Sequence, residues 1–442
     1  LVCRSILTLP RSLHELIWGL LLVNIWGLDP LTGIIAIAIP YGAIVGKVFS
    51  EILDETPSAN CLALTNSGVK PWTAFAYSII PQAYLNLLSY SFYRFECSLR
   101  SATVLGIIGA GGLGYQIYLS LQSLRYQELW TLFYALIFLN GLVDVSSNWL
   151  RRRLGCVSRL DLNAGKLTSS RKVNINNNFI FLGLNFSWLI LVLSCFCYLQ
   201  PDLTKIWHSQ TLNNLQQLFS LAFPPTLSPE TMGQLFNLTS QTLAMSILAI
   251  TLAGIGGIII SFPAANNFSL MGVHHFKKSP LAWLCLITCR LFLLLCRAIP
   301  SPIWALIALF VLFPGILPGS LALGIHNLGI LGRLMAEVNE NLEKAPLQAL
   351  QAQGTPPASV VIYGVLPLTL NKFIAYILYR WEVCMRETVI VGLVGAGGLG
   401  KLLTEQLSSF DYAGVAATLI CFIFLTFMVD RISAIVRSQT YL

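Results

Sequence analysis

Charged side chains are scarce in this chain of 442 residues, where Asp, Glu, Lys and Arg together make up 10%. Soluble domains carry roughly a quarter, so this shortage excludes a soluble enzyme. Histidine is also rare, with five residues. Neither the histidines nor the eleven cysteines show the spacing of a metal site such as His-Glu-x-x-His or Cys-x-x-Cys. We therefore expect no bound metal and no other cofactor.

Apolar residues are abundant instead, at 55% of the chain. A helix needs about 20 apolar residues to cross about 30 Å of hydrocarbon, because its backbone must satisfy its own hydrogen bonds in lipid. The segments that meet this condition are 10–28, 31–50, 76–106, 128–150, 177–199, 234–262, 281–313, 317–337, 366–392 and 412–436. The sequence thus predicts an all-α polytopic membrane protein with about ten transmembrane helices.

The positive charges predict the orientation in the bilayer. The stretch 151–172 carries seven Lys and Arg residues against a single acid, Asp161, and such an excess marks a cytoplasmic loop. By alternation, the loop 200–232 lies outside and the C-terminus lies in the cytoplasm. We expect a multi-pass protein of the bacterial inner (plasma) membrane, in contact with the lipid bilayer and with no nucleic acid partner.

The chain repeats itself at an offset of 286 residues, without gaps. Tyr93-Arg94-Phe95-Glu96 aligns with Tyr379-Arg380-Trp381-Glu382, and GIIGAGGLG from Gly106 aligns with GLVGAGGLG from Gly392. Such a match predicts two tandem membrane modules in parallel orientation.

The repeat predicts the domain organisation. We expect a first module at 1–150, a basic cytoplasmic linker at 151–176, an extra transmembrane helix at 177–199 and a second, complete module at 233–442. Since residue 1 aligns with residue 287, the first copy lacks a counterpart of the helix 234–262 and is interpreted as truncated. The sequence leaves open whether this module is functional or the chain is a gene fragment. It also leaves open whether one fused chain or a dimer forms the pathway.

Each copy carries a glycine-rich motif. The pattern G-x-G-x-x-G resembles a nucleotide-binding loop, but it follows a predicted transmembrane helix rather than a strand, and Leu402 stands where a Walker loop needs Ser or Thr. We interpret the motif as a tight turn at the membrane edge that permits close helix approach. Its residues are Gly109, Gly111, Gly112 and Gly114 in the first copy and Gly395, Gly397, Gly398 and Gly400 in the second.

Ionisable residues lie inside two predicted spans, where charge is costly unless it is paired or faces a polar cavity. They are Arg94, Glu96 and Arg100 in the first copy and Arg380, Glu382, Arg386 and Glu387 in the second. One interpretation is structural ion pairs one helical turn apart, Glu96 with Arg100 and Glu382 with Arg386. The other is that Arg94 and Arg380, on a different helix face, line the pathway and guide an oxyanion.

A second repeated motif lies on the side assigned to the cytoplasm. It comprises Ala63, Gly68 and Pro81 in the first copy and Gln348, Ala349, Gly354 and Pro367 in the second, with 13 residues from glycine to proline in both. This spacing predicts a short helix, a glycine break and a proline at the start of the next span. Such an element suits the docking of a partner, although an ordinary inter-helix loop is the alternative.

These residues resemble the transmembrane permease subunits of ATP-binding-cassette (ABC) importers, whose signature is E-A-A-x-x-x-G followed by I-x-L-P. Within that superfamily, YGVLPLTLNKFIAYI and LYRWEVCMRETVIVGLVGAGGLG are most similar to phosphonate importer permeases, here in a fused double-length form. The signature glutamate is replaced by Gln348 and Leu62, and its isoleucine by Gly364 and Ser78.

The resemblance implies a transport subunit that is not an enzyme, built from two modules similar to a methionine-importer permease. It implies a cytoplasmic ABC ATPase dimer docked on the loops around 52–70 and 338–356, whose closure drives alternating access. It also implies an external substrate-binding protein that delivers a phosphonate or a related phosphorus oxyanion. Two alternatives stay open: a permease of the same superfamily for another cargo such as methionine, and a secondary transporter or channel without an ATPase.

Overall fold

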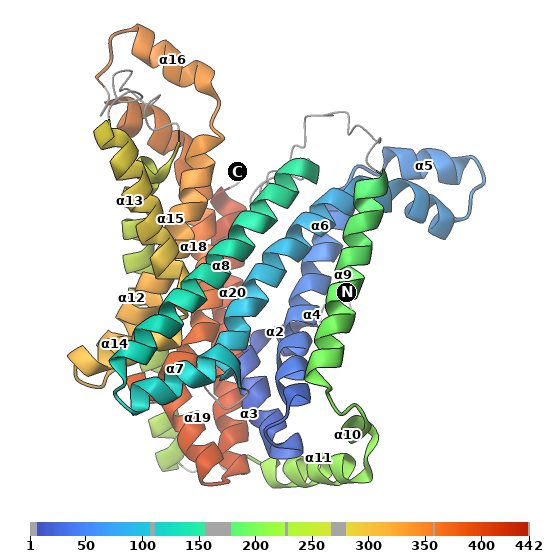
Figure 1. Ribbon diagram of the computed structural model, residues 1–442, viewed down its shortest axis with the longest axis vertical. Helices are drawn as coiled ribbons and strands as arrows, with labels where there is room; N and C mark the ends of the chain where they lie inside the picture. Colours follow the sequence, from blue (N-terminus) through green and yellow to red (C-terminus); the bar gives the residue numbers. More distant parts are fainter. Residues whose placement is uncertain are drawn as a thin grey trace. The chain divides into compact units, whose positions relative to one another are not determined.

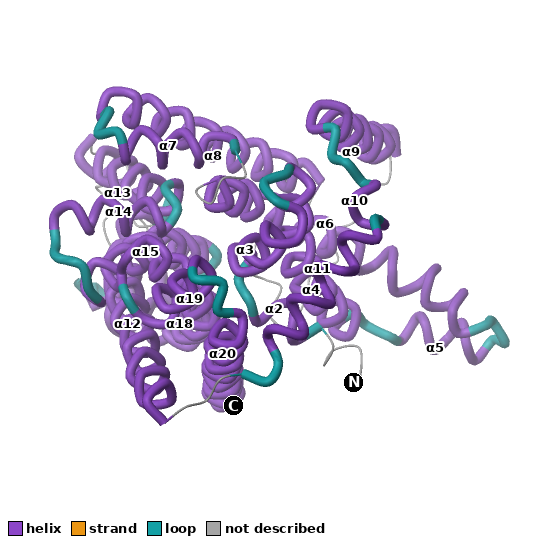
Figure 2. Tube along the Cα trace, turned by 90° about the horizontal axis from the view of Figure 1, so that it is seen from below, coloured by secondary structure: helices purple, strands orange, loops and turns teal. Residues whose placement is uncertain are grey.

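The computed structural model describes residues 7–106, 111–154, 178–225, 229–266, 280–356 and 359–440 (Figure 1). All regular structure in these ranges is helical (Figure 2). Within these described ranges, six helices are long and apolar enough to cross a membrane, or seven if a bent pair counts as one span. The predicted all-α membrane fold is thus confirmed. Most of the predicted linker 151–176 lies outside the described residues.

The chain divides into two compact units, one built mainly from residues before 216 and one mainly from the residues that follow. The first unit contains α2 (Thr8–Ser12), α3 (Glu15–Trp26), α4 (Pro30–Glu55), α5 (Ala59–Asn66), α6 (Pro71–Leu105), α7 (Gly112–Gln122) and most of α8 (Tyr126–Leu154). Asp29 begins α4 by accepting a hydrogen bond from the Leu31 amide at 2.8 Å, with Pro30 at the first helical position. Leu22, Ala36 and Leu105 form a buried core that joins α3, α4 and α6.

Three further helices follow: α9 (Asn178–Leu199), α10 (Thr204–Trp207) and α11 (Ser209–Ala222). Within the first unit, α10 and α11 contact the corner between α3 and α4. Lys205 forms an ion pair with Asp29, and the Trp26 indole donates to Thr211 Oγ1 at 3.1 Å. The Asn214 side chain donates to the Ile25 carbonyl at 3.1 Å. These contacts attach the segment after α9 to the first module.

The second unit contains α12 (Pro229–Ala264), α13 (Pro280–Ala298), α14 (Ser301–Val311), α15 (Ile316–Glu340), α16 (Lys344–Ala352), η6 (Val360–Val365), α18 (Leu366–Val391), η7 (Gly392–Ala396), α19 (Gly398–Ser408) and α20 (Tyr412–Thr440). Its centre is α15, of whose apolar stretch 78% is buried. Glycines allow the close packing: a Cβ on Gly257 of α12 would lie 3.3 Å from the Gly332 amide of α15. Small residues at such crossings let helix backbones approach.

Two of the predicted spans are broken. The segment 281–313 divides into α13 and α14, which meet at an angle of 94°. Pro300 stands at the break, and proline both lacks the amide donor and clashes with the preceding helical turn. The segment 10–28 divides likewise into α2 and α3.

The same hydrogen bond crosses both breaks. The Trp304 indole donates to the Cys296 carbonyl at 3.2 Å, and the Trp18 indole donates to the Pro10 carbonyl at 3.3 Å. These four residues are related by the offset of 286. The duplication seen in the sequence therefore extends to the hydrogen bond that spans each break.

Candidate functional site

The glycine motif forms a turn between two helices in the second unit. Gly395 and Gly397 have φ angles of 105° and 87°, in the left-handed region that favours glycine. The Leu399 amide then donates to Thr242 Oγ1 of α12 at 2.9 Å. Gly398, Leu399 and Gly400 are buried, so this turn does not present open amides to a phosphate.

The first unit repeats this turn. Gly111 and Gly112 have φ angles of 83° and 74°, while Gly109 lies outside the described residues. A Cβ on Gly114 would lie 1.9 Å from the Thr103 carbonyl oxygen, and one on Gly400 would lie 2.3 Å from that of Val389. Both positions therefore exclude any side chain because two backbones touch there.

The ionisable residues of the second unit lie in a buried network. Arg380 is 5% exposed, and its Nε and Nη2 atoms donate to Asn327 Oδ1 at 2.8 and 2.5 Å. Its Nη2 also lies 3.2 Å from Glu387 Oε1. Glu382 pairs with Arg437 of α20 at 2.7 Å, while its pairing with Arg386 stays a prediction. The pathway role of Arg380 stays a prediction, since here its charge is paired inside the helix bundle.

In the first unit, aromatic rings surround the corresponding arginine. The Arg94 guanidinium lies 5.7, 5.2 and 5.7 Å from the ring centroids of Tyr41, Tyr90 and Tyr93, within the range of cation–π attraction. Its Nε atom donates to the Tyr90 hydroxyl at 2.7 Å. The remaining predicted residues of this helix are Glu96, which is buried, and Arg100, which donates to Cys97 Sγ at 3.3 Å.

The predicted docking motif forms short helices, α5 and α16, followed by Gly68 and Gly354 with φ angles of 83° and 80°. In both views α5 lies apart from the helices packed around α4 (Figures 1 and 2). The side chains of Ala63, Gln348 and Ala349 are exposed.

The prolines of this motif do not match the prediction equally. Pro367 is the second residue of α18, as expected for the start of a span. Pro81 instead lies inside α6, which begins at Pro71. Proline is strongly favoured at a helix start, but a long helix tolerates one inside at the cost of a hydrogen bond, and packing overrides the local signal here.

The sequence did not single out several residues that share these networks. Asn327, with no exposed surface, is the main partner of Arg380. Tyr41 contacts Arg94, and the Ser101 hydroxyl donates to Glu15 Oε1 at 2.5 Å. The repeat could have identified them, because polar residues stand at equivalent positions of both copies.

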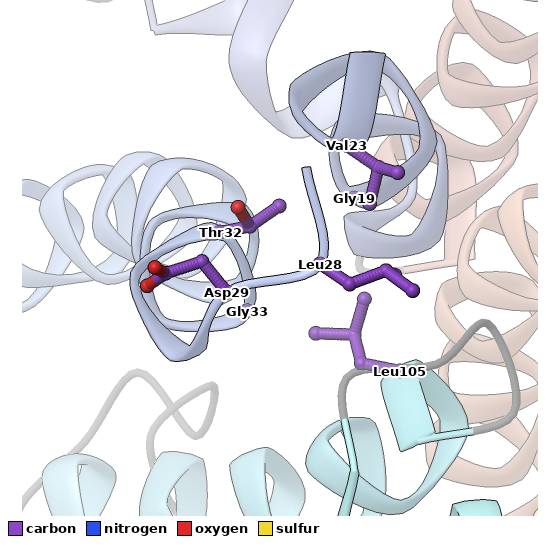
Figure 3. A pocket seen from close by; sticks show the side chains of 7 residues that line it. All are labelled: Gly19, Val23, Leu28, Asp29, Thr32, Gly33 and Leu105. Carbon is purple, nitrogen blue, oxygen red and sulfur yellow. The ribbon is translucent and has the colours of Figure 1, made fainter. Parts of the chain in front are cut away.

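A small pocket lies at the α3–α4 corner of the first unit (Figure 3). Gly19, Val23, Asp29, Thr32 and Leu105 are among its lining residues and come from α3, α4, the corner between them and α6. Its volume of about 10 Å³ is room for a single water molecule. It is therefore too small for a transported solute.

One protein family matches each of the two repeated copies separately. The family described as "Binding-protein-dependent transport system inner membrane component" matches residues 1–155 and again residues 287–440. The phosphate-import permease protein PhnE of Mycolicibacterium smegmatis is 26% identical over 445 residues, which cover 99% of this chain and 77% of that protein. The phosphite transport system permease protein PtxC of Stutzerimonas stutzeri is 34% identical over 199 residues, or 45% of this chain and 68% of that protein.

Two further similarities concern shorter parts of the chain. A putative cryptic phosphonate transport system permease protein, PhnE2 of Escherichia coli, is 36% identical over 119 residues, covering 27% of this chain and 98% of that protein. A solved structure of the MetNI methionine ABC transporter is 17% identical with a TM-score of 0.42, covering 48% of this chain and 99% of that one. The matched family consists of transport components rather than enzymes. With both of its copies matched, the chain belongs to the family of binding-protein-dependent transport system inner membrane components.

Proposed function

We propose that this protein is the permease of an ATP-driven, binding-protein-dependent importer of a phosphonate or a related phosphorus oxyanion. The observation that carries the proposal is the similarity to PhnE over 99% of the chain. The matched relatives PtxC and PhnE2 are named for phosphite and phosphonate transport. Phosphate, phosphite and phosphonate share a tetrahedral phosphorus centre with anionic oxygens, so one permease design suits all three.

The proposed partners are a cytoplasmic ATPase dimer and an external substrate-binding protein. We place the ATPase dimer at α5 and α16, because both are short helices with exposed alanines next to a glycine break. This assignment puts the C-terminus in the cytoplasm and the glycine turns toward the outer side. The two modules then lie at 1–150 and 233–442, with the helix 177–199 between them.

Arg94 and Arg380 are the proposed cations that guide the oxyanion. Guanidinium groups match the oxygens of phosphorus oxyanions in shape and charge. Arg380 is paired with Glu387 and Asn327 in this structure, so it meets the solute only in a conformation in which α15 and α18 separate. Arg380→Gln is expected to lower uptake per folded molecule, with uptake normalised to the amount of folded transporter in the membrane.

Growth on methylphosphonate as the sole phosphorus source tests the proposal. The host lacks its own phosphonate uptake and expresses the permease with its ATPase and binding protein. We expect growth, and loss of growth when the ATPase is catalytically inactive. Uptake of methionine instead of the phosphonate would contradict the cargo. Uptake without the ATPase, abolished by a protonophore, would favour a secondary transporter.

A further inference from the structure

Each unit holds a polar network around an arginine at the same repeat position; Arg380 is buried and Arg94 is half-buried. In the second unit the network joins Arg380 and Glu387 of α18 to Asn327 of α15. Besides the bonds to Arg380, the Asn327 side-chain nitrogen lies 3.4 Å from Glu387 Oε2. One amide side chain therefore bridges the cation and the carboxylate, and all three residues belong to one unit.

The first unit contains a corresponding chain of contacts. Ser101 of α6 donates to Glu15 Oε1 of α3 at 2.5 Å. The Tyr41 hydroxyl of α4 lies 2.7 Å from Ser101 Oγ, and the Tyr41 ring faces the Arg94 guanidinium at 5.7 Å. Glu15 and Ser101 are 8% and 6% exposed. Here a phenol connects the cation to the carboxylate through a serine.

The repeat offset aligns these networks residue by residue. Arg94 aligns with Arg380 and Tyr41 with Asn327. The other two positions are exchanged: Ser101 aligns with Glu387, and Glu15 aligns with Ser301. Ser301 is 4% exposed. Each unit thus has one carboxylate and one serine at the same two repeat positions, in opposite arrangement; Glu15, Ser101 and Ser301 are buried and the Glu387 side chain is 12% exposed.

Charge balance explains why the two positions vary together. A buried cation that loses its carboxylate leaves an uncompensated charge in a low-dielectric interior. A second carboxylate beside the first adds like-charge repulsion, so one of the two would have to be protonated. One carboxylate per arginine is therefore favoured, whichever of the two helices supplies it.

We propose that Glu15 is the first module's counterpart of Glu387: a positioning residue that holds Arg94 through Ser101 and Tyr41, as Glu387 holds Arg380 with Asn327. The role is defined by the position of the arginine and does not depend on the transported solute. In the first module the carboxylate can then stand at position 15 or at position 101, with serine at the other. In the second module it can likewise stand at position 387 or at position 301.

A charge-swap experiment in the full-length protein tests this inference. The first readout is the amount of monodisperse protein extracted from membranes and its thermal midpoint, which need neither cargo nor ATPase. We expect Glu15→Ser alone to lower the folded yield at least about tenfold, because the network around Arg94 loses its carboxylate. Ser101→Glu alone is expected to lower it as much, because two carboxylates then lie side by side. The double variant is expected to recover to within about twofold of the parent, because the two changes are coupled.

Matched control variants distinguish a specific exchange of the carboxylate between positions 15 and 101 from a general tolerance of these substitutions. Glu15→Ser combined with Ser89→Glu makes the same chemical changes but places the acid at another buried serine of α6, and it is expected not to recover. In the second unit, Glu387→Ser with Ser301→Glu should recover as the first-unit pair does. Uptake per folded molecule then reports whether Arg94 is correctly positioned. The double swap of Glu15 and Ser101 should regain uptake, while Glu15→Gln should not.

Two results would overturn the inference: a double swap no better than Glu15→Ser alone, or a Glu15→Ser variant equal to the parent in yield and stability. Recovery of yield and stability in a chain that shows no phosphonate uptake even as the parent would refute the proposed cargo and leave this inference standing.

Discussion

Asp29 connects two parts of the first unit by accepting from the α4 backbone and pairing with Lys205. The hydrogen bond from Lys205 is the main cause that lowers the pKa of Asp29 below its usual 3.8, against the opposing effect of partial burial. The same hydrogen bond raises the pKa of Lys205 above 10.5. The stabilisation is therefore complete from about pH 4 to about pH 10. It is lost as the pH falls through the lowered carboxyl pKa or rises through the raised ammonium pKa.

Asp29→Asn should loosen α11 at neutral pH. A nitroxide spin label at position 212, an exposed position of α11, is expected to become more mobile at pH 7, with an opening equilibrium changed by up to about fivefold, as for other exposed ion pairs. Below the lowered carboxyl pKa, the parent's label should become as mobile as the variant's. Asp54→Asn, at the other end of α4, is the control. Equal spectra of parent and Asp29→Asn at pH 7 would contradict this role.

Gly400 tests the close contact at the turn. Gly400→Ala is expected to destabilise the second unit by at least about 2 kcal/mol, because its Cβ would overlap a backbone oxygen that cannot move aside. Gly233→Ala is the matched control, since no atom lies within 4 Å of that Cβ. Thermal unfolding in detergent measures both. Equal midpoints for the two variants would show that the turn can relax.

At the scale of elements, the two docking helices differ in how they are held. Leu347 of α16 is 5% exposed and packs with Val360 and Val365. A Cβ on Gly364 would lie 2.9 Å from Leu350 Cδ1, so α16 sits directly on η6. In the first unit Cys61 replaces Leu347 by the repeat offset, and none of the α5 residues is fully buried. α16 is therefore the more rigidly attached of the two.

Leu347→Ala should release α16 from its unit. Removing a buried leucine side chain costs about 2–5 kcal/mol, and we expect amide hydrogen exchange over 344–352 to accelerate accordingly. Cys61→Ala is the counterpart in α5 and is expected to change the exchange over 59–66 little. A similar acceleration in both helices would contradict the difference in anchoring.

The sequence predicted the elements better than their ends. Apolar length located every long helix, and the offset of 286 located the repeated turns. The breaks before α3 and α14 were not predicted, because a long apolar run hides a bend. Pro300 stands at the break before α14, whereas the aligned residue before α3 is His14. The ion pair of Glu382 with Arg437 of α20 was not predicted either. It forms because α18 and α20 pack together, and the spacing of residues within one helix does not indicate a partner on another.

At the scale of the whole molecule, the segment after the linker belongs partly to the module before it. α10 and the first part of α11 fall in the first compact unit, through the contacts of Lys205, Thr211 and Asn214. If the chain is divided within the linker, one fragment carries the α3–α4 corner and the other carries α10 and α11, which bind it.

Co-expression of residues 1–165 with residues 166–442 tests this arrangement. We expect the fragments to co-purify, because the bonds from α10 and α11 to the α3–α4 corner do not need the covalent link. Adding Asp29→Asn and Thr211→Ala should lower the recovered complex several-fold, as the loss of two polar contacts would. Adding Asp54→Asn should not. Fragments that purify separately would show that the linker itself holds the parts together.

The paired turns also have a genetic consequence. Gly114 and Gly400 each tolerate no side chain, yet every base change at the first two positions of a glycine codon introduces a side chain or a stop. In a saturation library selected for transport, substitutions should therefore be depleted at codon 114 and again at codon 400, which are separated by the repeat offset of 286 codons. Codons 15 and 101, and likewise 301 and 387, should instead survive only as linked double changes.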